Sequence, residues 1–441
     1  MKGDFSRLTF DPKKQFTRVL MQQGRVQLDA DWNEQAAILL HYLERLAADL
    51  IGPFGGPVKA DGTPGDGFRI AATDTGFTIG AGRYYVDGIL AENPAEATHT
   101  RDPKTETFPF LVYLDVWERH VTFIEEGSIR EVALEGPDTA TRAQVAYRVR
   151  LTSTLPNGEA IPPDVDVQKT FPAWVDVFQP PNRGGLKAKT ISSGDSTDPC
   201  VASPAAGFRG LENQLYRVEI HTGGKAGAGA TFKWSRDNGS VTFPIADIAT
   251  DSKAATTTVT LETLGHEGRS ALAVGDRVEI ADGDDVSLGL LPVAAVDAER
   301  RQVTLSGLAT VGKEKPKHPL LRRWDYGRSK NGPKPAEDGA LPIQEGTDVL
   351  LEDGVQISFQ PADPAHFYRA GDYWLIPART ATGDVEWPQV PDPPPPGQSP
   401  GPATLPPFGV LHRYAPLALV LAGGEVKDRR SSFKPMGLPI P

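Results

Sequence analysis

The strongest helical pattern in the chain is an apolar repeat near its start. Four leucines recur at intervals of four, three and four residues, which places them on one face of an α-helix: Leu39, Leu43, Leu46 and Leu50. Asp31 and Glu34 resemble a capping box, and Gly52-Pro53 ends the pattern. We therefore predict a helix over about residues 32–51. Its apolar face is wide, so it packs either on its own domain or, with the preceding arm, on a neighbouring subunit.

After Asp61 the pattern changes to a period of two residues. Short alternating segments are separated by Gly and Asp-Gly turns, which is typical of antiparallel strands. The segment 108–123 is predicted as a strand pair or one long strand, and its centre is apolar on both faces, which indicates burial between two layers. Asn238-Gly239 lies between the alternating segments 231–236 and 240–243 and favours a hairpin. We predict a mainly β fold with antiparallel, sandwich-like sheets and one N-terminal helix.

Changes of pattern also divide the first half of the chain. We interpret residues 1–60 as an extended arm followed by the helix, and residues 61–153 as a β domain. Residues 154–206 hold an excess of Pro, Gly, Ser and Asp. This composition is typical of loops, so we interpret the segment as a long irregular connection.

The second half contains a unit of its own. Four or five short strands within residues 251–312 indicate a small β-barrel. The segments 231–243 and 349–376, on either side of it, share the same aromatic, Gly-turned character. We therefore predict that the barrel is inserted into a second β domain, formed by residues 207–250 together with 340–441.

Composition adds two local features to this picture. The chain has 441 residues, with 45 glycines and 40 prolines, and nine of the prolines fall within 391–407. That segment excludes a helix or a central strand and favours polyproline II or a loose loop. Positive charge gathers in residues 313–334. We interpret this run as a solvated loop, with an electrostatic contact to an acidic neighbour as the functional alternative.

Charge and hydropathy exclude several classes of partner. The net charge is −11, which argues against binding nucleic acid or anionic lipid, because phosphate binding needs clustered positive charge. The start of the chain lacks the apolar run of a signal peptide. No apolar stretch reaches the ~18 residues of a membrane span. The single cysteine, Cys200, excludes an intramolecular disulfide, and we interpret it as an inert thiol.

The sequence contains no convincing catalytic motif. The eight histidines form no pair at metal-binding spacing. A G-x-S-x-G match at 397–401 lies in the proline-rich segment and lacks the strand-turn-helix context of a nucleophile elbow. We therefore predict no catalytic residue, no cofactor and no enzymatic activity.

Two binding alternatives remain open from the residues alone. A carboxylate cluster could contact calcium but lacks the spacing of an EF-hand, so a solvated turn is preferred: Asp282, Asp284 and Asp285. Four aromatic residues could form a sugar-stacking face, although aromatic residues on strands more often belong to the core: Trp234, Tyr373, Trp374 and Trp387.

Several long strings carry a resemblance to a known family. They are MKGDFSRLTFDPKKQFTRVLMQQGRVQLDADWNEQAAILLHYL (1–43), VYLDVWERHVTFIEEGSIREVALEGPDTATR (112–142), LENQLYRVEIHTGG (211–224), GATFKWSRDNGSV (229–241), LEDGVQISF (351–359) and YRAGDYWLIPART (368–380). On these strings the chain resembles a bacterial family of uncharacterised function, often encoded beside phage-tail-like contractile injection systems. The stretch GAGRYYVDG (80–88) also resembles strand elements of phage baseplate and tail-fibre attachment proteins.

The resemblance implies a structural or adaptor component of such a particle, at its baseplate or periphery. We expect it to form a homo-oligomer, to bind other subunits through its arm and loops, and to assemble in the bacterial cytoplasm into a particle that can act outside the cell. The alternative is a cargo protein, or one that binds or hydrolyses surface glycans. The residues expected at its contacts are aromatic and arginine side chains: Phe5, Phe10, Arg25, Trp32, Trp234, Arg236, Arg322, Arg323 and Trp374.

Overall fold

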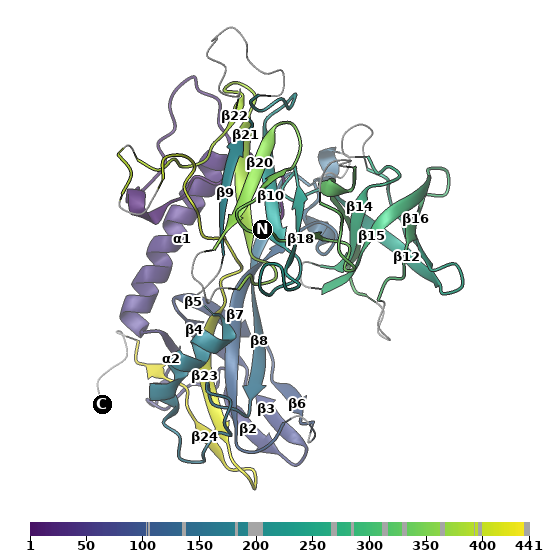
Figure 1. Ribbon diagram of the computed structural model, residues 1–441. Coiled ribbons are helices and arrows are strands. Elements are labelled where there is room, and N and C mark those ends of the chain that lie inside the picture. The colour runs from purple at the N-terminus through teal and green to yellow at the C-terminus, as the bar shows by residue number, and fades with distance from the viewer. Residues whose placement is uncertain are drawn as a thin grey trace.

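The computed structural model describes residues 1–102, 104, 106–134, 138–180, 184–192, 206–265, 271–283, 286–310, 316–328, 333–361, 367–391, 393–395 and 399–435. It confirms a mainly β fold with antiparallel sheets and an N-terminal helix. Figure 1 shows two stacked β bodies, a barrel that projects from the upper one, and the helix along the opposite side. In the described part of the chain, no helix is both long enough and apolar enough to cross a membrane.

The helix α1 (Asp29–Ile51) begins slightly earlier than expected and ends where Gly52-Pro53 predicts. Asp31 is not the N-cap. It lies at the third helical position, where its side chain accepts a hydrogen bond from the amide of Leu28 at 3.3 Å. A carboxylate in the first turn satisfies a free amide and favours the positive end of the helix dipole.

The lower body contains three sheets. Their strands, in spatial order, are β25 (Ser432–Phe433), β1 (Phe54–Pro57), β4 (Gly82–Val86) and β5 (Ile89–Asn93); then β2 (Ile70–Thr73), β3 (Gly76–Ile79) and β6 (Ala97–Thr100); then β24 (Val426–Asp428), β23 (Arg413–Val420), β7 (Phe110–Val121) and β8 (Arg142–Thr152). Short 3-10 turns lie at Gly127–Ile129 and Val132–Leu134.

Strand β7 lies between two layers, as its apolar pattern indicates. Alternate residues from Phe110 to Val116 pack on one side against the strands of the smaller sheets. Leu111 and Tyr113 point to the other side, where they meet a second helix, α2 (Val167–Phe178). This alternation follows from the period-two geometry of a strand. Both faces of β7 are therefore covered.

Helix α2 corrects the prediction of an irregular connection over 154–206. Strand β9 (Gly185–Thr190) lies in the same interval. The helix begins at Val167 after Asp166, whose side chain accepts a hydrogen bond from the amide of Lys169. Such N-caps stabilise a helix even where loop-forming residues surround it.

The upper body holds two sheets on a shared core of aromatic and aliphatic side chains. One has the order β18 (Leu341–Pro342), β11 (Thr231–Ser235), β10 (Gln214–Ile220), β21 (Tyr373–Arg379) and β22 (Asp384–Val385); the other has β19 (Asp348–Leu350), β20 (Val355–Gln360) and β9. Strand β23 instead pairs with β7 in the lower body. Residues 340–441 therefore do not form one domain with 207–250, which corrects that prediction.

The barrel is closed, with the strand order β12 (Thr242–Asp251), β13 (Thr256–Leu261), β16 (Gln302–Ser306), β15 (Val286–Asp297), β14 (Arg277–Asp282) and β17 (Pro319–Trp324). It extends beyond the predicted 251–312 at both ends. A 3-10 turn (Asp325–Arg328) follows it, and β11 and β18, the strands before and after the barrel, are neighbours in one sheet.

The Asn238-Gly239 turn is real, but it does not join two paired strands. Both residues have positive φ, 50° and 68°, as Asn-Gly turns favour. Strand β11 pairs with β10 and β18, whereas β12 pairs with β13 and β17. The predicted hairpin is therefore wrong, and the turn directs the chain from the sheet into the barrel.

Candidate functional site

Helix α1 leaves most of its apolar surface uncovered. Only Ala30 and Ile38 among its residues are buried. A line of large apolar side chains on its outer face is between 53% and 68% exposed: Trp32, Leu39, Leu43, Leu46 and Leu50. Apolar surfaces of this extent on a folded chain usually mark a contact with another molecule.

The arm, residues 1–28, runs alongside the helix. The Thr9 hydroxyl donates to Glu34 at 2.6 Å, and the Val19 amide donates to Gln35 at 2.8 Å. Phe10 contacts the ring of His41, with centroids 5.6 Å apart. Beyond these contacts the arm exposes further apolar side chains, and four of them are more than half exposed over residues 16–26: Phe16, Leu20, Met21 and Val26. Arm and helix therefore both expose large apolar side chains.

The first residues of the arm lie against the upper body. Phe5 packs on an apolar cluster of Leu215, Tyr373 and Leu375. The Asn238 amide donates to the carbonyl of Gly3 at 2.8 Å. The turn that leads into the barrel therefore also anchors the arm.

A buried group of charges lies beneath this end of the arm. Glu219 on β10 stands directly opposite Lys233 on β11. The Lys233 ammonium is 2.8 Å from both carboxylate oxygens of Glu279 on barrel strand β14, and 3.5 Å from Glu219. Arg217 donates to Glu219 at 2.6 Å, and Lys2 approaches the same carboxylate at 3.7 Å. The cluster thus joins sheet, barrel and arm.

Both carboxyl groups in this cluster are ionised at neutral pH. Burial alone would raise the pKa of Glu219, but Lys2, Arg217 and Lys233 together outweigh burial and hold it far below its usual range. Burial acts in the same sense on Glu279, yet Lys233 and Lys2 lower the pKa of that carboxyl to about 2. The charges therefore compensate one another inside the protein.

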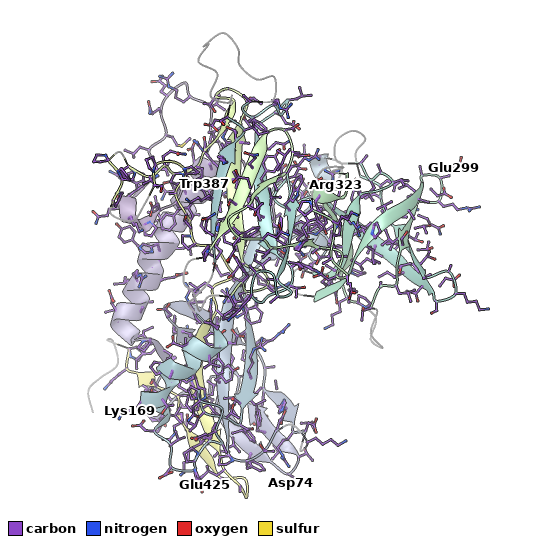
Figure 2. All side chains as sticks on the ribbon, viewed as in Figure 1. Asp74, Lys169, Glu299, Arg323, Trp387 and Glu425 are labelled. Atoms are coloured by element: carbon purple, nitrogen blue, oxygen red, sulfur yellow. The ribbon has the colours of Figure 1, made fainter. Side chains whose placement is uncertain are left out.

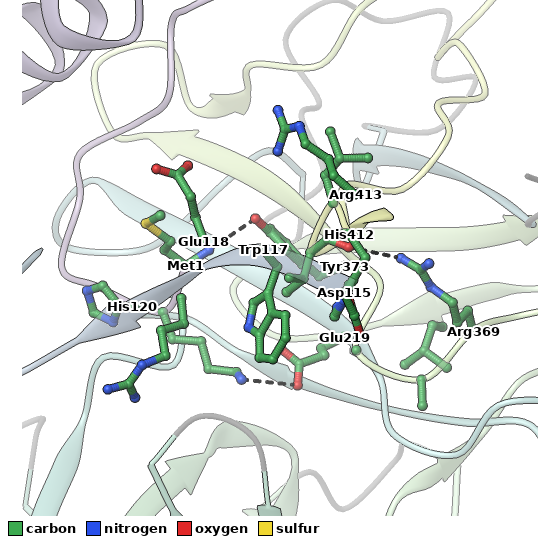
Figure 3. A pocket seen from close by; sticks show the side chains of 18 of the residues that line it. Met1, Asp115, Trp117, Glu118, His120, Glu219, Arg369, Tyr373, His412 and Arg413 are labelled. Carbon is green, nitrogen blue, oxygen red and sulfur yellow. Dashed lines mark hydrogen bonds and ion pairs between the residues drawn. The ribbon is translucent and has the colours of Figure 1, made fainter. Parts of the chain in front are cut away.

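A pocket of about 930 Å³ opens where arm, helix and both β bodies meet. Figure 3 shows side chains from β7, β10 and the segment before β23 around it. On one wall, Asp115 binds the Nδ1 atom of His412 at 2.6 Å and accepts from Arg150 at 2.8 Å. The His412 ring stacks on Trp117, with centroids 4.9 Å apart. A buried carboxylate of this kind fixes the orientation of the imidazole ring.

The described residues contain no group of three or more histidine, cysteine or carboxylate side chains that could hold a metal ion. Asp282 accepts hydrogen bonds from the amides of Lys317 and His318, which is a structural role. Asp284 and Asp285 lie outside the described residues.

Comparison with family models decides the classification. A model described as a family of unknown function, DUF6519, matches residues 1–166 and 180–437. The chain belongs to this family. Comparison with curated proteins and with solved structures gives no match.

Of the residues predicted at contacts of this DUF6519 member, three of the four on the arm and the helix lie where a partner can reach them. Trp32 and Arg25 are exposed, and Phe10 lines the pocket. Phe5 is instead occupied within the chain, since it packs on the upper body.

The other predicted contact residues belong to the interior. Trp234 and Trp374 are buried in the core of the upper body, together with Trp387 (Figure 2), so these residues form no exposed sugar-stacking face. Arg236 is partly buried and pairs with Glu352 at 2.7 Å.

Arg322 and Arg323 correct the interpretation of 313–334 as a solvated loop. Both lie on β17 and are only 2% and 3% exposed. Arg322 donates to the carbonyl of Gly239 at 3.0 Å, and Arg323 donates to Asp325 at 3.1 Å, where barrel and sheet meet (Figure 2). Arg322 thereby links β17 to the turn that leads from the sheet into the barrel.

The sequence reasoning missed the buried charges Glu219, Lys233 and Glu279. A signal was present in the pattern: Arg217 and Glu219 are two apart on a strand and therefore share one face. Charged strand faces usually meet solvent, but here the barrel and the arm cover this one.

Proposed function

We propose that this protein is a structural or adaptor component of a contractile phage-tail-like injection particle, and that it attaches to other subunits through its arm and α1. The observation that carries the proposal is the exposed apolar face of α1, in which five large side chains are more than half exposed. Removing that surface from water on assembly is favourable by about 25 cal/mol per Å².

The rest of the chain suits this role. Buried charges join the upper β body to the barrel, so this part of the chain forms a firm support. The arm adds its own exposed apolar residues beside the helix. Arms of this kind bind by lying along a neighbouring subunit. The choice of an injection particle as the assembly rests on the resemblance to a family encoded beside injection systems.

The test is co-purification with the particle. The tagged chain is co-expressed with the injection-system genes, and particles are isolated and probed for it. We expect wild type to sediment with sheath and tube proteins, and the double variant Leu43→Glu/Leu46→Glu to be lost from the particle fraction.

Leu211→Glu is the matched control, since Leu211 is 93% exposed and belongs to neither the arm nor α1. It should sediment with the particle as wild type does. A wild-type chain that stays free in the soluble fraction whenever particles form would contradict the proposal.

A further inference from the structure

The exposed apolar residues on the outer face of α1 recur with a shorter period than those of an ordinary surface helix. Six residues follow one another at intervals of 4, 3, 4, 3 and 4: Trp32, Ala36, Leu39, Leu43, Leu46 and Leu50. All six are apolar and all six are exposed. This is the seven-residue repeat by which α-helices pack on one another in coiled coils. We call these six residues the α1 seam.

The period of 3.5 residues in the α1 seam indicates which kind of secondary-structure element can pack on it. A repeat of 3.5 residues keeps side chains in line only along a second helix, which supplies holes for them at the same interval. A strand or an irregular loop offers no such interval. Within the described residues the second helix, α2, cannot serve, because its apolar side chains Val167, Phe171 and Trp174 are already buried on the lower body.

The residues that flank the α1 seam favour an identical partner. On one side they are Asn33, Leu40 and Ala47, and on the other Gln35, Tyr42 and Asp49. In coiled coils these positions set the choice of partner through charge. Here only Asp49 is charged, so two copies of α1 face each other, in either orientation, without a row of like charges.

Packing of two such helices also requires little ordering. Helix α1 is already folded along the side of the molecule, with its outer face turned away from both β bodies (Figure 1). A preformed surface binds without the entropic cost of folding on contact. The α1 seam is about 27 Å long at 1.5 Å per residue.

We propose that copies of this chain associate with one another through the α1 seam, as a coiled coil of α1 helices. The inference rests on the proposed function, since it names a partner for the same surface. If the inference holds, each copy of this chain contacts another copy of the same chain within an assembly.

The first experiment measures the mass of the purified full-length chain by sedimentation velocity over a range of concentrations. We expect wild type and Leu211→Glu to form multimers. We expect Leu43→Glu/Leu46→Glu to weaken self-association by roughly a hundredfold or more, because charges enter the centre of the seam. Circular dichroism and thermal melting establish that the variants are folded.

The second experiment uses cysteine cross-linking in a Cys200→Ser background. Leu39→Cys and Leu43→Cys chains are oxidised alone and as a mixture, with Arg45→Cys, exposed on α1 but away from the seam, as control. Disulfide dimers of either single variant support parallel helices, and dimers that form only in the mixture support antiparallel ones. Arg45→Cys should give few dimers in either case.

Two outcomes would overturn the inference. One is a multimer that the seam variants leave unchanged. The other is a wild-type chain that is monomeric at every concentration and gives no disulfide dimers. If that monomer still sediments with particles and requires Leu43 and Leu46 to do so, a helix of a different protein covers the seam, and the proposed function stands without self-association.

Discussion

Lys233 shows how a single side chain can join two parts of this protein. It stands on the sheet of the upper body, and its ammonium group lies between Glu219 on the neighbouring strand and Glu279 on the barrel. The ammonium also lies 4.4 Å from the ring centre of Trp324, whose indole NH donates to Glu279 at 2.9 Å. The charge is therefore satisfied on every side that the described residues define.

Replacement of Lys233 by alanine should be strongly destabilising. It leaves Glu279 and Glu219 buried with fewer cations, and breaking a buried ion pair by removing one partner costs about 3–5 kcal/mol. Urea denaturation followed by tryptophan fluorescence measures the loss. Lys189→Ala is the control, since Lys189 pairs with Asp348 at 2.6 Å while both side chains are nearly half exposed. It should cost at most about 1 kcal/mol. Equal losses in the two variants would contradict the argument.

Glu352 predicts a pH dependence of stability. Burial raises its pKa to about 7, although Arg236 beside it acts in the opposite direction. In the unfolded chain the carboxyl ionises near its ordinary value of 4.5. Between these values the folded state binds more protons, so Glu352 destabilises the fold as pH rises from about 4.5 to about 7.

The variant Glu352→Gln should remove this dependence. From pH 5 to pH 8 we expect it to gain stability relative to wild type by on the order of 3 kcal/mol. Urea denaturation at each pH provides the comparison. Glu299→Gln, at an exposed position far out on the barrel (Figure 2), should follow the wild-type curve. Parallel curves for wild type and Glu352→Gln would show that the argument is wrong.

At the scale of residues, the sequence does not reveal whether a charged side chain is buried or which distant residue it contacts. Arg322 and Arg323 read as part of a charged run, because most arginines are solvated. Arg322 is 83 residues from its partner Gly239 in sequence, and the two meet only in the folded barrel. Asp115 and His412 are 297 residues apart in sequence, so no local pattern could have paired them.

At the scale of elements, the two helices contrast in what they bury. Helix α2 packs Val167, Phe171 and Trp174 into the lower body, whereas α1 buries Ala30 and Ile38 alone. The apolar side chains of α2 therefore stabilise its own fold, and those of α1 remain available to a neighbour.

Trp174→Ala should test the contribution of α2. The side chain is 1% exposed, and its indole NH donates to the carbonyl of Thr154 at 2.8 Å. Loss of a buried tryptophan costs about 3–5 kcal/mol through lost burial and the cavity it leaves. Val177→Ala on the same helix is the control, because Val177 is 53% exposed. Thermal melting should show a large decrease only for Trp174→Ala; similar melting of both variants would contradict the assignment.

Periodicity predicted the elements well where it was long and uninterrupted. The leucine repeat of α1 and the apolar centre of β7 both gave the correct element. Helix α2 was missed although Phe171, Trp174, Val175 and Phe178 recur at helical spacing, because the excess of Pro, Gly, Ser and Asp over 154–206 suggested a loop. The exposure of α1 could not be predicted, since an apolar stripe indicates burial without stating by what.

At the scale of the whole molecule, the end of the chain completes the body that the first third begins. Strand β23 lies between β24 and β7, and β25 pairs in parallel with β1. Buried residues of β23 reach both layers of the lower body, with Leu417 on one face and Leu419 on the other. Each body therefore depends on pairing between distant segments.

Deletion of residues 413–441 should leave the lower body unable to fold. It removes the central strand β23, exposes the edge of β7 and uncovers two apolar clusters, which favours aggregation. A chain ending at Pro435 retains every described strand and should remain soluble. Expression followed by size-exclusion chromatography compares the two truncations. A soluble, monodisperse product from the shorter chain would contradict the topology.

The position of the barrel has a consequence for how such chains diversify. Since β11 and β18 are neighbours, with Phe232 opposite Leu341, recombination could remove the barrel and rejoin the sheet through a short link. The chain connectivity is compatible with removal of the barrel. The buried ammonium of Lys233 would, however, lose its closest carboxylate, because Glu279 belongs to the barrel. Chains that lose or replace the barrel should therefore carry a compensating change at position 233, which makes this one position a marker of that history.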